Sequence, residues 1–408
     1  MKILQRKYPT YKIFRHCFAS AFAFFSVCSL SQAQAILNIQ GAYVYTEPNT
    51  LIHVNGDVSF TDGNLEHNGV MEITGNWSNT NQSNNEAFAP ASNGEVKLIT
   101  GVQEIQGFTT TAFPSLSLEG YDTKRLIINT KVTRNLNLND LQLDVNGNDM
   151  WVTNTATNAI TRTTGYVNTS DHPMGRLLRS VSASGSYDYP LGGGAQFRYR
   201  PLNAVVAEDG VLAGQFQNYD AAKDGYDHLN SVAQSFNVIN DKFYHVVTQV
   251  SGVGSADVKI PYSTTDDGNF NGLARWVDKH WTDASYHYNG AEAGQGTDMA
   301  MHYHMADGGT HILALTDTIS IDPIFVVSGF TPNGDGKNDY FVIKGLENYK
   351  FNEIKVFNRW GRIVYTTLYY KNDWAGNGLD MDTYMYMLRV VDMKGKERVI
   401  TGDVTLIR

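Results

Sequence analysis

Short runs in which apolar and polar residues alternate with a period of two dominate the chain from residue 36 onward. Such alternation is typical of β-strands that bury one face. Gly, Asn and Asp, which favour turns, separate the runs, and long helical periodicity is scarce. The pattern therefore predicts an all-β protein.

Between residues 36 and 165 the predicted strands recur with a similar spacing. The segment His53–Val58 resembles Glu72–Trp77, nineteen residues further on, and Gly94–Leu98 follows at a similar step. Each strand offers only two or three apolar positions, so stacking of successive coils would be needed to complete a core. We interpret residues 36–165 as a short β-solenoid, with a β-sandwich as the alternative.

Residues 166–320 carry longer runs and more aromatic side chains. Segments such as Gly165–Val167, Arg176–Arg179 and Tyr187–Gly194 suggest hairpins of a second β domain. We expect a jelly-roll-like β-sandwich here.

Residues 321–408 contain six or seven short strands separated by turn residues. This spacing predicts a small immunoglobulin-like antiparallel sandwich. We expect its aromatic core to come from five side chains, which are Phe357, Trp360, Tyr365, Trp374 and Tyr384.

The segment Thr331–Asp339 must be a tight loop. Pro332 fixes its own φ angle, two glycines permit positive φ, and the Asn and Asp side chains can bond to their own backbone. The same oxygens could surround calcium, but Lys337 would occupy a ligand position and repel the ion. A self-bonded turn is therefore favoured.

Five blocks of this segment occur in order: FTPNGDGKND, FNEIKVFNRWGRIVY, NDWAGN, TYMYML and GDVTLIR. Together they resemble the gliding-motility-associated C-terminal domain of Bacteroidetes, the type B sorting domain of the type IX secretion system. The family usually has Gly just before the Thr-Tyr strand, where this chain has Asp382. The residues that carry the resemblance are Pro332, Asn333, Gly334, Asp335, Gly336, Asn338, Asp339, Asn358, Arg359, Trp360, Gly361, Trp374, Gly376, Gly402 and Arg408.

The resemblance implies a sorting signal and no chemical activity. Such a domain is a signal that the type IX translocon or shuttle at the outer membrane reads, so that the rest of the chain reaches the cell surface or medium. The function of the preceding residues must be inferred separately.

Residues 1–35 have the pattern of a secretory signal peptide. Basic residues precede the apolar run Cys17–Leu30, and Ala33–Ala35 provides small residues for cleavage. The run has 14 residues, fewer than the ~20 that span a bilayer, so no transmembrane segment is expected in the mature chain. Both cysteines, Cys17 and Cys28, lie in this segment, which excludes thiol chemistry afterwards.

The net charge argues against nucleic acid as a partner. The full chain carries −9, and loss of the five basic residues in 1–35 leaves 27 Lys and Arg against 41 Asp and Glu, or −14. An acidic surface repels phosphate backbones.

One segment has the ligand spacing of a calcium loop. Its candidate ligands are Asp267, Asn269, Asn271 and Asp278, and Gly272 stands where such loops turn sharply. The alternative is an ordinary hairpin turn rich in Asn and Asp. No other cofactor is predicted.

Other groups of residues give weaker indications of function. His302 and His304 share a strand face near His311 and could bind a metal, but ordinary surface histidines are favoured. Trp276 and Trp281 could stack on sugars or lie in a core, and the core is favoured. No Gly-x-Ser-x-Gly or His-Glu-x-x-His motif occurs, so we expect a protein that is not an enzyme.

The sequence thus predicts a signal peptide (1–35), a solenoid (36–165), a sandwich (166–320) and a sorting domain (321–408). We expect an adhesion or surface-coat role outside the cell. The alternative is a polysaccharide-binding or polysaccharide-active protein, with surface glycans as partners and a site on the solenoid.

Overall fold

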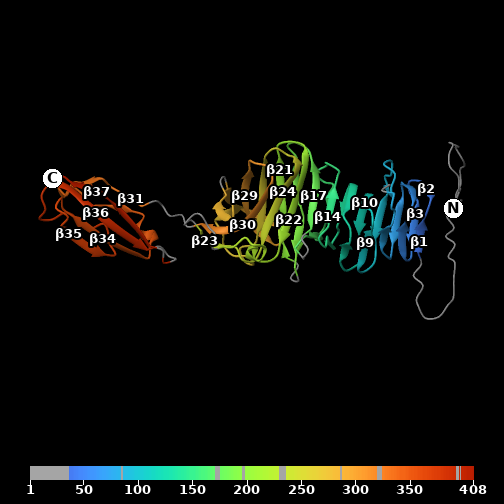
Figure 1. The fold of residues 1–408 in the computed structure, drawn as a ribbon, viewed down its shortest axis with the longest axis horizontal. Coiled ribbons are helices and arrows are strands. Elements are labelled where there is room, and N and C mark those ends of the chain that lie inside the picture. The colour runs from blue at the N-terminus through green and yellow to red at the C-terminus, as the bar shows by residue number, and fades with distance from the viewer. Residues whose placement is uncertain are drawn as a thin grey trace. The chain divides into compact units, whose positions relative to one another are not determined.

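The computed structural model describes residues 36–83, 86–170, 175–194, 198–228, 236–284, 287–318, 324–391, 395 and 397–408 (Figure 1). The chain divides into two compact units: unit 1 extends to Asp317, and unit 2 runs from Thr318 to Arg408. The all-β prediction is confirmed, since strands make up nearly all of the regular structure. The predicted signal peptide lies outside the described residues. Within the part that the structure describes, no helix combines the length and apolar character needed to cross a bilayer.

One face of unit 1 is a nine-stranded sheet in which neighbouring strands run parallel as far as β19. Its last strand, β20, is antiparallel to β19. The strands are β1 (Ile36–Ile39), β4 (Asp57–Phe60), β7 (Trp77–Asn79), β9 (Gln103–Gly107), β11 (Lys124–Leu126), β13 (Gln142–Asp144), β16 (Tyr166–Asn168), β19 (Leu191–Gly193) and β20 (Arg198–Tyr199).

The opposing sheet of unit 1 has fourteen strands, and its first part is also parallel. That part contains β3 (Leu51–Val54), β6 (Val70–Ile73), β8 (Glu95–Leu98), β10 (Thr111–Leu118), β12 (Thr130–Asn137), β14 (Asp149–Val152), β15 (Ile160–Thr161) and β17 (Arg176–Val181). A third face begins with the parallel pair β2 (Ala42–Thr46) and β5 (Gly63–His67).

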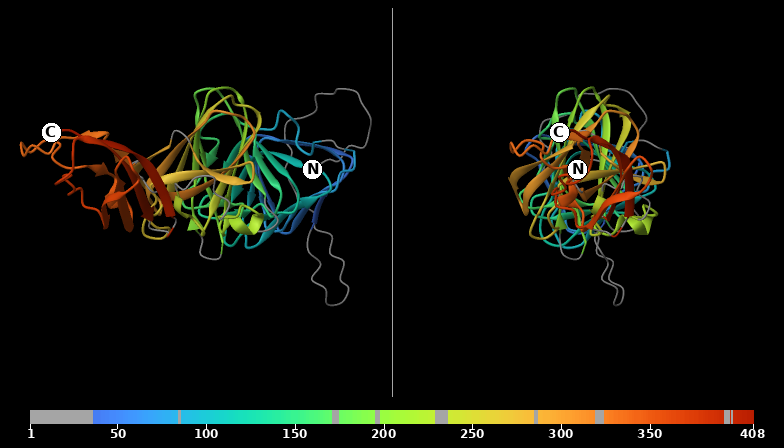
Figure 2. Two further views of the ribbon diagram at one scale, coloured as in Figure 1. Left: turned by 60° about the vertical axis from the view of Figure 1, so that its left-hand side comes forward. Right: turned by 90° about the vertical axis from the view of Figure 1, so that its left-hand side faces the viewer.

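The chain passes through these faces in turn and so forms a β-solenoid of about seven turns (Figure 2). Val54 pairs with Ile73 and Val58 with Trp77, which confirms the predicted nineteen-residue repeat. Apolar side chains occupy the same inward position in successive coils, as in the fully buried series Val58, Trp77, Ile105 and Leu126. Stacking completes a core that no single coil could form.

The number of residues per coil increases where a longer loop connects two strands. Trp77 pairs with Ile105, and the intervening loop places Phe88 beside Leu65 and against the Trp77 ring, at 5.2 Å between centroids. Phe88 therefore fills the interior that a strand of the third face would otherwise fill.

The parallel stack continues beyond residue 165, where the sequence places a boundary. Strand β16, predicted as part of a hairpin, instead continues the solenoid because it pairs in parallel with both β13 and β19. Strand β17 pairs in parallel with β14 on one side and antiparallel with β22 on the other. The sheet therefore changes from solenoid to antiparallel pairing without a break, within one compact unit.

The rest of unit 1 consists of two antiparallel sheet regions, which contribute to the apolar core of the solenoid and have a second buried cluster around Trp281. The region that extends the large sheet contains β22 (Gly210–Gln217), β23 (Phe236–Ile239), β24 (Tyr244–Gly252), β26 (Gly272–Val277), β27 (His280–Asp283) and β30 (Thr310–Thr318), with the 3-10 helix η1 (Ala221–Asp224). The other is a five-stranded sheet of β18 (Ser186–Tyr189), β21 (Leu202–Val206), β25 (Ala256–Tyr262), β28 (His287–Gly294) and β29 (Thr297–Met305). A jelly-roll topology stays a prediction.

Unit 2 has its own aromatic-rich core. A five-stranded sheet follows the order β32-β37-β36-β34-β35, with only the β32–β37 pair parallel, and β31 pairs with β33 separately. Its elements are β31 (Phe325–Val326), β32 (Gly329–Phe330), β33 (Ile343–Lys344), the 3-10 helix η2 (Leu346–Asn348), β34 (Phe351–Phe357), β35 (Ile363–Leu368), β36 (Asp382–Val391) and β37 (Glu397–Leu406). The immunoglobulin-like topology stays a prediction.

Candidate functional site

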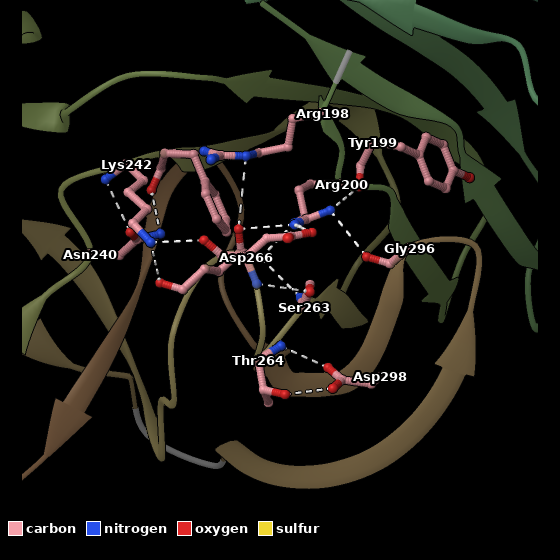
Figure 3. Close-up of polar contacts among 12 residues, drawn as sticks. Arg198, Tyr199, Arg200, Asn240, Lys242, Ser263, Thr264, Asp266, Gly296 and Asp298 are labelled. Atoms are coloured by element: carbon pink, nitrogen blue, oxygen red, sulfur yellow. Dashed lines mark hydrogen bonds and ion pairs between the residues drawn. The ribbon is translucent and has the colours of Figure 1, made fainter. Parts of the chain in front are cut away.

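The carboxylate of Asp267 lies in a buried ion pair. Arg200 donates to both of its oxygens, at 2.6 Å from Nε and 2.9 Å from Nη2, and the backbone NH of Ser263 adds a third hydrogen bond at 2.9 Å. Both charged side chains are almost completely buried. Figure 3 shows that Arg200, Ser263 and Lys242 lie around the segment that contains Asp266. A guanidinium bonded to both oxygens neutralises the carboxylate and would repel a cation.

One candidate ligand, Asp278, lies too far along the chain to join the others. Asn269 and Asn271 precede β26, while Asp278 follows it, in the turn that leads to β27. A six-residue strand extends about 20 Å, so it holds Asp278 far from Asn271. In a calcium-binding loop of this ligand spacing, all ligands must instead surround a single ion. The guanidinium partner of Asp267 and the strand before Asp278 argue against a shared calcium site, and calcium binding stays a prediction.

The buried pair instead joins four segments of unit 1. Lys242 donates to the backbone carbonyls of Asp266 and Asp267, at 2.8 and 2.9 Å, and Arg200 also donates to the carbonyl of Gly296. His245 bonds to the carbonyl of Arg200 at 3.0 Å. Burial, together with the Arg200 charge, lowers the pKa of His245 to about 4. This cluster is a structural link between loops.

The histidine and tryptophan candidates have structural partners. His304 pairs with Asp257, and the buried His311 is bonded to the hydroxyl of Tyr303 at 2.8 Å. Among the described residues, no group of three His, Cys, Asp or Glu is arranged to hold a metal ion. Trp281 is buried against Trp276 with ring centroids 5.3 Å apart, as the core interpretation predicts.

In unit 2 the loop from Thr331 to Asp339 is bonded to itself. The carboxylate of Asp339 accepts hydrogen bonds from the backbone NH groups of Gly334 and Gly336, both at 2.8 Å. The side chains of Asn333 and Asp335 accept from the NH groups two residues further on. Both glycines and Asn338 have positive φ angles. The favoured interpretation of a self-bonded turn is confirmed, and Pro332 lies within that turn.

The hairpin between β34 and β35 has a rigid tip. The side-chain oxygen of Asn358 accepts from the backbone NH groups of Trp360 and Arg362, at 3.1 and 3.0 Å. Gly361 takes a φ of 74° and donates to the carbonyl of Asn358. Arg359 pairs with Asp382 at the start of β36, which lowers the pKa of that carboxyl. Asp382, the departure from the family pattern, therefore anchors the tip.

Trp374 lies at the centre of the core of unit 2. Its ring is 6% exposed and stacks on Tyr365 at 5.4 Å and 27°, with Phe330 and Phe341 also in contact. The carbonyl of Trp374 accepts from the NH of Phe341 at 2.9 Å. The prediction of an aromatic core is confirmed for Trp374.

The last motif residues close this core. Gly376 has a φ of 63°, and a side chain there would lie 2.8 Å from Leu406. Gly402 lies beneath the ring of Tyr386, where an added Cβ would come within 2.5 Å of the hydroxyl. Arg408 donates to the carbonyls of Gly376 and Leu379, at 2.9 and 2.6 Å.

Two of the predicted core residues lie outside the core of unit 2: Phe357, which is half-buried, and Trp360. The side chain of Trp360 is 85% exposed, because the hairpin tip projects beyond the sheet. Sequence reasoning also missed Ile363 and Met385, which lie opposite Phe357 and are nearly half exposed. Their alternation with buried residues identifies them only as belonging to the outer face of a sheet.

Comparison with known families gives a match for this segment. Residues 324–406 match the family described as the CHU_C Type IX secretion signal domain. No curated protein and no solved structure matches the chain. The matched residues cover the described strands of unit 2. The chain therefore carries a C-terminal type IX secretion signal domain, and this signal directs export by the type IX system to the cell surface or extracellular space.

Proposed function

We propose that unit 1 is an adhesive or surface-coat module that acts by binding and not by catalysis. The observation that carries this proposal is the open first coil of the solenoid. Among the described strands, β1, β2 and β3 each have one neighbour, β4, β5 and β6 respectively. Their outer edges therefore present backbone NH and C=O groups to a partner.

Large apolar side chains lie on the same coil. Ile36, Tyr43, Tyr45 and Leu51 are each more than half exposed. Edge strands that combine open backbone groups with exposed apolar side chains favour pairing with another chain. A coil of this kind suits a protein that attaches to other molecules outside the cell.

The flat outer face nearby is polar by contrast. His53 pairs with Glu72 at 3.0 Å, and Lys97 pairs with Glu119 at 2.8 Å. These residues lie in a row because Glu72 is opposite both His53 and Lys97. A row of paired charges remains hydrated, so we expect contacts to concentrate on the first coil.

The test replaces the two exposed tyrosines of β2 in the native host. We expect Tyr43→Ser combined with Tyr45→Ser to reduce cell attachment several-fold, with an unchanged amount of protein at the surface. The control is Tyr121→Ser, because Tyr121 is exposed at a corner of the same solenoid. Unchanged attachment in the double variant, or an equal loss in the control, would contradict the proposal.

A polysaccharide ligand is the second candidate, and a specific arrangement favours it. Tyr43 and Tyr45 point to one side of β2, about 7 Å apart along the strand. Asn64 lies opposite Tyr43, and the Tyr43 hydroxyl donates to Glu66, a contact that raises the pKa of Tyr43 to about 12. Two aromatic rings beside an amide and a carboxylate can stack on sugars and bond to their hydroxyls.

A glycan-binding screen with the purified full chain separates the two candidates. Binding to a glycan that disappears in the double tyrosine variant would support polysaccharide recognition. Attachment that needs both tyrosines, with no glycan bound, would support a protein partner.

We also infer that residues 1–35 are removed during export across the inner membrane and that the source is a member of the Bacteroidetes. The basic and apolar pattern of the segment and the type IX signal support these inferences. N-terminal sequencing of the exported protein tests the cleavage, with Ala35 expected to be the last residue removed.

A further inference from the structure

Most motif residues of unit 2 have a function within their own domain. Trp374 fills the core, Asn358 holds the hairpin turn and Arg359 pairs with Asp382. Arg408 and Asp339 satisfy backbone groups of neighbouring loops. Their presence is explained by folding alone.

Trp360 is different. Its ring makes no aromatic or cation–π contact with any other described residue, and it is the most exposed large apolar side chain of the described chain. Folding does not explain a tryptophan in this position, since exposed apolar surface of this size contributes nothing to stability. Its backbone is nevertheless held firmly by Asn358.

An apolar surface surrounds the base of the same hairpin. Phe357 lies directly opposite Ile363 on one side and Met385 on the other, so the three side chains share the outer face of the sheet. Ile363 and Met385 are nearly half exposed, and Phe357 is half-buried between them. We call Phe357, Trp360, Ile363 and Met385 the tip patch.

We propose that the tip patch is the surface by which the type IX secretion machinery recognises this domain, with Trp360 as the side chain that inserts into an apolar pocket of the machinery. The proposal rests on export through the type IX signal. The occupant follows from the family match, because a secretion signal domain must be bound by a protein of the export apparatus.

The geometry suits such an anchor. Tryptophan is enriched among the few residues that dominate binding energy at interfaces. The hydrogen-bonded turn holds the backbone of Trp360 before binding, so little backbone freedom is lost on association. The nearby Arg359–Asp382 pair satisfies its own charges, which leaves the apolar side chains as the main feature of the surface.

The experiment measures export of the full chain in its native host. Trp360→Ala should lower the ratio of exported to periplasmic protein by roughly tenfold or more, as expected for a hot-spot tryptophan. Ile363→Ser should lower the same ratio, because it alters the patch through a different side chain. The melting temperature of purified Trp360→Ala should remain that of the parent, since its ring is solvated.

Leu368→Ser is the matched control. Leu368 is an exposed apolar residue at the other end of the same strand, β35, opposite Glu353. We expect it to be exported at the parent ratio. Normal export of both Trp360→Ala and Ile363→Ser would overturn the proposal, as would an equal loss in Leu368→Ser.

A further experiment distinguishes failure of the tip-patch proposal from failure of the type IX sorting signal. A chain that lacks Val326–Arg408 should stay in the periplasm. If it does, while Trp360→Ala is exported normally, only the tip patch is excluded. If the truncated chain is exported too, the sorting signal fails as well.

Discussion

Two tryptophans in unit 2, Trp360 and Trp374, illustrate what a sequence can and cannot predict at the scale of a residue. Both stand next to turn residues, and both were expected in the core. Trp374 is buried, but Trp360 is at the tip of a hairpin. Strand alternation assigns a face to residues within a strand, whereas a residue in a turn points wherever the turn geometry directs it.

This contrast gives a prediction for stability. Trp374→Ala should cost roughly 3 to 5 kcal/mol, because it removes a buried aromatic side chain. In a domain of this size such a loss lowers the melting temperature of unit 2 by well over ten degrees. Trp360→Ala, the matched control, should leave it nearly unchanged. Calorimetry of both variants checks the prediction, and similar melting temperatures for the two would contradict it.

The buried Arg200–Asp267 pair shows a second limit. The spacing of Asp267, Asn269 and Asn271 fits calcium, yet the partner of Asp267 is Arg200, which lies 67 residues earlier in the chain. Local sequence carries no signal for such a distant pairing. By contrast, the self-bonded Thr331–Asp339 loop was predictable, because every group that satisfies it lies within the loop.

The same cluster predicts a pH dependence. Burial and Arg200 lower the pKa of His245 to about 4, while an unfolded histidine titrates near 6.5. Between these values the unfolded state binds a proton that the folded state excludes. Stability should therefore be complete above about pH 6.5 and fall by up to about 3 kcal/mol as the pH drops to 4.

Urea unfolding of unit 1 in the full chain measures this effect. Burial also lowers the pKa values of His67 and His311, so part of the loss should persist without His245. We expect His245→Gln to lose clearly less stability than the parent between pH 7 and pH 4.5. Equal losses in the two proteins would show that His245 does not carry the effect.

At the scale of elements, the solenoid was predictable where the repeat is regular. The pairing of Val54 with Ile73 follows from two similar segments. The third face was missed, because β2 and β5 have no such likeness to one another and the next coil replaces a strand with the loop around Phe88. The extension of the solenoid through β17 was missed because that strand takes part in both parallel and antiparallel pairing.

The corners between coils depend on glycine where two backbones meet. Gly107 has a φ of 132°, and an added Cβ would lie 2.0 Å from the carbonyl oxygen of Asn79 in the preceding coil. Gly107→Ala must therefore separate two coils as well as strain its own backbone, which together should cost more than about 2 kcal/mol.

Gly41→Ala is the control for this prediction. Gly41 also has a positive φ, but an added Cβ would meet nothing within 4 Å. We expect it to cost about 1 kcal/mol from backbone strain alone. Thermal unfolding of unit 1 should show a clearly larger loss for Gly107→Ala, and equal losses would argue against tight stacking at this corner.

At the scale of the whole molecule, the chain combines a sorting domain, unit 2, with a separate compact unit, unit 1. Unit 2 has its own core and carries the type IX secretion signal, and the buried clusters of unit 1 contain no residue of unit 2. The sorting domain was predictable because its five sequence blocks are specific to the family that they resemble. The open first coil of unit 1 was not, because it depends on which strands lack a neighbour, and this emerges only from the assembled sheets.

The most direct test of this account is export of a chain that lacks Val326–Arg408, measured in the native host by fractionation into periplasm, cell surface and medium. Unit 1 should still fold, because its core contains no residue of unit 2. The account predicts that the truncated protein accumulates in the periplasm, while the full chain reaches the surface or medium. Arrival of the truncated protein outside the cell in the normal amount would contradict it.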